Sequence, residues 1–145
     1  MKPTKILSVL FVLTVALYFS PVYAQDHGGR PLTAQLSGSN VVPGPGDSDG
    51  EGTASITLNP GQGEITFNIS VSKVDNITGI HIHKGDATSN GPVVVPFTSS
   101  GELSGTVKDV DKDLIQDILK NPSGYYVQVH STDFPGGAIR GQLSK

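Results

Sequence analysis

The sequence predicts an all-β fold, an antiparallel Greek-key sandwich or barrel with one short inserted helix. Apolar and polar residues alternate along several segments, as in strands that place one face on a core and the other in water. Clusters of Gly, Pro, Asn and Asp separate these segments at short intervals, which is typical of β-sandwiches and barrels. One further segment has helical spacing of its apolar residues.

The clearest strand pattern covers residues 65–71, where apolar residues are separated by Thr66, Asn68 and Ser70. Turn-forming runs at residues 43–50 and 59–63 bracket another alternating segment. Seven or eight short strands result, and the expected spans are residues 32–36, 54–58, 65–71, 78–83, 93–97, 101–107, 124–130 and 138–143.

The helix is expected at residues 111–120, between two of the strands. Leu114 and Ile118 recur at helical spacing, and Asp111 or Asp113 can cap the start of the helix. A proline two residues after the end of this segment favours termination there.

The N-terminus has the three parts of a secretory signal over residues 1–24. Lys2 and Lys5 are followed by an apolar run, residues 6–18, and by a small-residue cleavage site that ends at Ala24. The apolar run is shorter than the roughly 20 residues of a membrane-spanning helix. An uncleaved N-terminal anchor is the alternative.

Cleavage would leave a flexible lead, residues 25–31, and one domain, residues 32–145. We therefore expect a secreted, extracellular or cell-surface protein with no membrane span, or a periplasmic one if the host is a diderm bacterium. Loss of Lys2 and Lys5 would change the formal net charge from -3 to -5, with 8 basic against 13 acidic residues. No basic patch is present, so nucleic acid is not an expected partner.

The chain contains no Cys, and Met1 is its only Met. This composition excludes thiolate catalysis, iron–sulfur clusters and blue-copper sites. Histidines are therefore the main candidates for metal chemistry.

Three of the four histidines lie where alternation places them on the side of a strand opposite the core. His81 and His83 are two residues apart, so their side chains leave the same face of one strand. His130 follows the apolar Val129 in a later strand, so it also leaves the face opposite the core. The alternation thus predicts three outward-facing histidines.

Two interpretations of these histidines stay open. They can be ordinary solvated surface residues, or they can bind one metal together through neutral imidazole nitrogens. Such nitrogens suit copper and zinc, with higher affinity for copper. We expect a metal site at His81, His83 and His130, with copper favoured and with affinity falling below about pH 6.5. An open fourth position would make such a site potentially catalytic.

Arg140 is expected on the same outward face, since its neighbour Ile139 would point to the core. A cation beside a metal can recruit an anion, so Arg140 is a candidate anion guide. An ordinary solvated Arg is the alternative.

Three segments in order resemble the opening, central and C-terminal motifs of CHRD (chordin-type) domains. They are LSGSNVVP at residues 36–43, HIHKG and NGPVV within residues 81–94, and GYYVQVHS with PGGAIRGQL within residues 124–143. The resemblance covers residues 32–143 and implies an immunoglobulin-like or superoxide-dismutase-like sandwich, without implying one activity. In chordin-like proteins such domains accompany growth-factor antagonism. One departure is Asn40, at a position before the Val-Pro pair that is usually acidic in the family.

His81, His83 and His130 are also similar to three copper-ligand positions of copper–zinc superoxide dismutases, and Arg140 to their anion-guiding Arg. The chain has no metal-bridging His after Pro92, and the zinc ligands and the disulfide of those enzymes are missing. This second resemblance implies at most a mononuclear, three-His copper site.

Weaker candidates lie elsewhere. Cleavage after Ala24 would place His27 third in the chain, where the terminal amine, two amides and the imidazole suit copper(II) or nickel(II). The alternative is a His in a disordered tail. Asn68 and Asn76 each begin a glycosylation sequon.

The sequence therefore predicts a secreted CHRD-domain protein that acts as an extracellular binding module and binds a metal, copper favoured, through three histidines. Its partner would be an unidentified extracellular protein or surface. One alternative is a mononuclear copper redox enzyme of superoxide-dismutase-like type. Another is a purely structural or adhesive surface protein.

Overall fold

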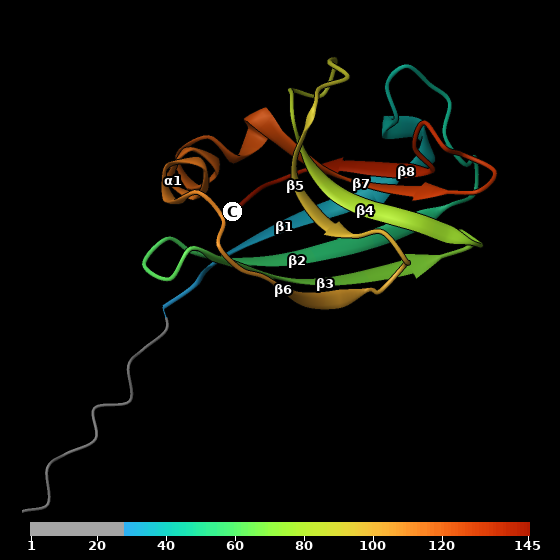
Figure 1. The fold of residues 1–145 in the computed structure, drawn as a ribbon. Coiled ribbons are helices and arrows are strands. Elements are labelled where there is room, and N and C mark those ends of the chain that lie inside the picture. The colour runs from blue at the N-terminus through green and yellow to red at the C-terminus, as the bar shows by residue number, and fades with distance from the viewer. Residues whose placement is uncertain (1–27) are drawn as a thin grey trace, which may run out of the picture.

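Eight antiparallel strands form one sheet in the computed structural model, which describes residues 28–145 (Figure 1). The strands are β1 (Arg30–Ser37), β2 (Glu51–Asn59), β3 (Glu64–Ser72), β4 (Ile77–Lys84), β5 (Val93–Thr98), β6 (Ser104–Val107), β7 (Tyr125–Ser131) and β8 (Ile139–Gln142). The helical elements are η1 (Gly38–Asn40), α1 (Lys112–Lys120) and η2 (Pro122–Gly124). The predicted signal peptide, residues 1–24, and the second metal candidate His27 lie outside the described residues.

The sheet curls into a nearly closed barrel. Its strand order is β5-β4-β7-β8-β1-β2-β3-β6, and the two end strands, β5 and β6, contact each other. Phe67 on β3 and Phe97 on β5 stack across this seam, with ring centroids 4.4 Å apart and an interplanar angle of 4°. The predicted all-β antiparallel fold with one short helix is confirmed.

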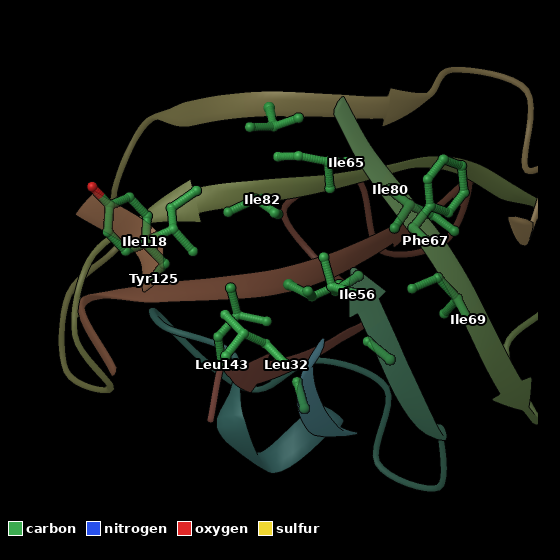
Figure 2. Packing of buried hydrophobic residues seen from close by; sticks show 14 of the residues in the cluster. Leu32, Ile56, Ile65, Phe67, Ile69, Ile80, Ile82, Ile118, Tyr125 and Leu143 are labelled. Atoms are coloured by element: carbon green, nitrogen blue, oxygen red, sulfur yellow. The ribbon is translucent and has the colours of Figure 1, made fainter. Parts of the chain in front are cut away.

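Alternate residues of the strands fill the barrel with aliphatic side chains. Ile56, Leu58, Ile65 and Ile80 have no exposed surface, and Figure 2 shows several of these side chains meeting between the strands. Complete burial of one such side chain contributes about 1.5–3 kcal/mol. A core of this kind explains how a domain without Cys remains folded.

Helix α1 agrees with the prediction to within one residue. The side chain of Asp111 accepts a hydrogen bond from the backbone N–H of Asp113 at 2.8 Å and so caps the start. Ile115 and Ile118 are fully buried in the barrel core. Within residues 28–145, no helix has the length and apolar character needed to cross a membrane.

Three strands begin two or more residues from the expected start, namely β1, β2 and β6, and β2 begins at Glu51 rather than at residue 54. β1 begins at Arg30, where Arg30 and Pro31 pair with Leu58 and Thr57, so the end of the predicted lead belongs to the sheet. β6 begins at Ser104, three residues later than expected, because the preceding segment turns through Gly101, which has a φ of 86°.

Candidate metal centre

The sheet formed by β4, β7 and β8 has one apolar face and one polar face. The apolar face lies on the core and includes Ile80, Ile82 and Val129, all without exposed surface. The opposite face, here called the polar face, consists of His81, His83, Tyr126, Gln128, His130, Arg140 and Gln142. The prediction that the three histidines leave the side opposite the core is confirmed.

The polar face is covered rather than open to water. His83 is 7% exposed, and Gln128 and Arg140 are each 1% exposed. The covering segments are residues 85–92, between β4 and β5, and residues 132–138, between β7 and β8; carbonyl groups of both segments pair with side chains of the polar face. The alternative of an ordinary solvated side chain is therefore wrong for His83 and Arg140.

The three histidines lie together. Ring centroids are 5.0 Å apart for His81 and His130, 5.7 Å for His81 and His83, and 5.8 Å for His83 and His130. One ring nitrogen from each lies within 4.8 Å of the other two. A tetrahedral metal at about 2.0–2.1 Å from each nitrogen sets them about 3.3 Å apart, so small ring movements would bring all three onto one ion.

Hydrogen bonds to backbone carbonyls hold two of the three rings. The Nδ1 atoms of His83 and His130 lie 2.9 Å and 3.0 Å from the carbonyl oxygens of Gly91 and Pro135. A carbonyl only accepts, so each Nδ1 is protonated, and in the neutral tautomer the lone pair is on Nε2. Both Nε2 atoms, and Nδ1 of His81, are buried without a hydrogen-bond partner. A backbone carbonyl behind a ring is the usual support of a metal-binding His.

The surroundings favour the neutral form of His81 and His83. Burial, and then the charges of His130 and His83, lower the pKa of His81 to about 4. Burial is also the main cause that lowers the pKa of His83, against the opposing effect of the Gly91 hydrogen bond. Neutral imidazole is the form that binds metal. The expected loss of metal affinity at low pH stays a prediction.

Arg140 lies on the polar face, as predicted, but it is not solvated. Its guanidinium donates hydrogen bonds to the carbonyls of Ser89, at 2.8 Å, and Asp86, and it lies 3.5 Å above the centre of the Tyr126 ring. That ring stacks on His83 with centroids 4.9 Å apart and planes 12° apart. Arg140 thus fixes residues 86–89 next to the Tyr126 ring that stacks on His83. Its role as an anion guide stays a prediction.

Gln128, which the sequence pattern did not single out, also lies beside the three histidines. It is directly opposite His81 on the neighbouring strand and lies two residues before His130. Its Nε2 donates to the carbonyl of Gly136 at 2.8 Å, whereas its buried Oε1 has no hydrogen-bond partner. The alternation that placed His130 also placed Gln128 on this face, so the signal was present in the sequence.

The two glycosylation sequons begin at exposed residues. Asn68 lies on the outer face of β3, and Asn76 lies in the turn before β4 with a φ of 50°. Both side chains are accessible to modification, which stays a prediction.

The geometry defines an eight-stranded β domain with a cluster of three histidines on a covered sheet face. The model of the CHRD domain family matches residues 32–143, so the chain belongs to that family. No curated protein and no solved structure matches the chain.

Proposed function

We propose that this CHRD domain is an extracellular binding module with a mononuclear metal centre formed by His81, His83 and His130. Membership of the CHRD family supports the binding module, whose partner is an unidentified extracellular protein or surface. Two observations carry the metal centre: one ring nitrogen of each histidine lies within 4.8 Å of the other two, and each histidine has a buried nitrogen without a hydrogen-bond partner.

Copper is the metal that this donor set favours. Three neutral nitrogen donors bind first-row divalent metals with an affinity that is highest for copper(II), and imidazole is also a good ligand for zinc. Two ring orientations are already fixed by backbone carbonyls, so less ordering is required when the ion binds. Gly91 is part of this support, because a Cβ at that position would lie 1.6 Å from the Lys84 carbonyl oxygen.

A copper redox enzyme of superoxide-dismutase-like type is a second candidate function. The partial exposure of His81 and His130 favours it, since a reactant needs a route to the metal. Catalysis also requires an open coordination position. A superoxide dismutation assay on the copper-loaded protein separates this function from metal binding alone.

The test is a copper(II) titration followed by electron paramagnetic resonance on the chain without residues 1–24. All variants carry His27→Ala, so that the N-terminal nitrogen set cannot contribute through this imidazole. One protein keeps His81, His83 and His130, and the second also carries His81→Ala and His83→Ala. We expect one equivalent to bind with nitrogen hyperfine structure, and the signal to be lost in the double variant. Equal binding and equal spectra in both proteins would contradict the proposal.

A further inference from the structure

Four buried polar side-chain atoms in residues 28–145 have no hydrogen-bond partner, and all four belong to the polar face. They are His81 Nδ1, His83 Nε2, His130 Nε2 and Gln128 Oε1. The first three are the proposed metal ligands. Buried polar groups without a partner are rare in folded proteins, because each loses its hydration without compensation. The fourth atom therefore needs an explanation, and its neighbours supply one.

The position of Gln128 places it among the histidines. Its Cα pairs with that of His81 across β4 and β7, and His130 follows two residues later on the same face of β7. On one face of a sheet, a side chain has its nearest neighbours at the directly opposite position of the adjacent strand and two residues away on its own strand. His81 and His130 occupy these two positions relative to Gln128.

The orientation of the Gln128 amide is determined by the covering segment. Its neighbour at 2.8 Å is the carbonyl oxygen of Gly136, which only accepts, so the NH₂ group occupies that position. Gly137, with a φ of 135°, allows this contact, because a Cβ there would lie 1.7 Å from Nε2. The NH₂ group is thus held by the segment, and the amide oxygen is left as a free acceptor.

We propose that Gln128 Oε1 is the fourth donor of the metal centre, giving a set of three nitrogens and one oxygen. This inference rests on the proposed metal site of His81, His83 and His130. An amide oxygen is a known weak axial ligand beside stronger donors at copper sites, where the axial ligand tunes the properties of the metal. With the fourth position filled by the protein, the centre is closed, as in sites that hold a metal rather than expose it to a substrate.

The test compares copper(II) affinity and electron paramagnetic resonance spectra of Gln128→Leu and Gln128→Glu with those of the parent, all carrying His27→Ala. Gln128→Leu removes the oxygen, and we expect copper affinity to fall by about 10-fold or more. Gln128→Glu keeps an oxygen donor of the same reach but loses the NH₂ group that donates to Gly136, so we expect its copper affinity to fall less than that of Gln128→Leu. Both spectra should change while the nitrogen hyperfine structure persists.

The matched controls are Gln35→Leu and Gln35→Glu, at an exposed position on β1. They change the same kind of side chain on a strand that carries none of the three histidines, so they should leave affinity and spectrum unchanged. Unaltered spectra and affinities in both Gln128 variants, with copper still bound through the histidines, would overturn the fourth donor and leave the three-His site standing. Failure of the parent to bind copper would instead remove the site itself.

Discussion

The outer faces of β1–β2–β3 and of β4–β7–β8 have the same sequence pattern and opposite surroundings. On the first, outward side chains such as Gln35, Ser55 and Asn68 are exposed to water. On the second, the outward Gln128 and Arg140 are almost completely buried. The alternation of apolar and polar residues thus identifies the face of the sheet on which a residue lies. The covering segments determine whether that face is exposed to water.

The covered face also differs in chemistry. Its residues are ionisable or strongly polar, and they pair with backbone carbonyls of residues 85–92 and 132–138. The outer face of β1–β2–β3 has small hydroxyl and amide side chains, such as Thr66, whose hydroxyl lies 2.9 Å from that of Thr106 on the neighbouring β6. The same kind of sheet therefore supports a polar cluster in one region and an ordinary surface in the other.

The largest expected effect is that of removing the buried guanidinium. Arg140→Met leaves the carbonyls of Asp86 and Ser89 without a donor, so we expect the free energy of unfolding to fall by about 2–4 kcal/mol. The matched change Arg30→Met, at an exposed Arg of β1, should cost less than about 0.5 kcal/mol. Urea denaturation measures both, and equal losses would remove the distinction between the two faces.

Metal binding at the three histidines of the polar face should raise the free energy of unfolding. Zinc at about 100 times its dissociation constant should raise the free energy of unfolding by about 2.7 kcal/mol, because the ion binds the folded state. The gain should disappear in His81→Ala/His83→Ala. Denaturation with and without zinc gives this difference, and a gain retained by the double variant would place the ion elsewhere.

Acid should weaken the metal-free protein through His81. The unfolded chain protonates this imidazole near pH 6.5, whereas the folded protein does so only at a pKa of about 4. The unfolded state binds more protons between these values, so stability falls as pH is lowered through this window. Denaturation of His81→Gln should show a flatter profile over this window than the parent, and parallel profiles would contradict the burial of this ring.

The smallest effect is expected on the solvated face. Thr66→Val removes a hydroxyl contact with Thr106 at 2.9 Å between two exposed side chains. Water replaces the lost partner, so the free energy of unfolding should change by less than about 0.5 kcal/mol. A loss above about 1 kcal/mol in urea would show that this face is less solvated than its exposure indicates.

Local sequence patterns predicted much of the fold and identified the three histidines that lie together in the candidate site. Period-two alternation located the strands, the acidic residue Asp111 marked the helix start, and the spacing of His81 and His83 placed both on one face. These features depend on neighbours within a few residues, which is why the sequence reveals them.

The surroundings of the site could not be predicted in the same way. The Arg140 guanidinium meets the carbonyls of Asp86 and Ser89, more than 50 residues earlier in the chain. The amide of Gln128 is likewise oriented by the carbonyl of Gly136 in an irregular segment, which leaves its Oε1 buried without a partner. Such contacts depend on where irregular segments fold over a sheet, and no local periodicity encodes that position.

The most direct measurement is nuclear magnetic resonance of the histidine side-chain nitrogens during a zinc titration of the His27→Ala protein. We expect His81, His83 and His130 to respond together and to saturate at one equivalent. We also expect coordination through Nδ1 of His81 and through Nε2 of the other two, whose Nδ1–H groups continue to donate to the carbonyls of Gly91 and Pro135. Rings that respond separately, or not at all, would contradict a shared metal centre on the covered face.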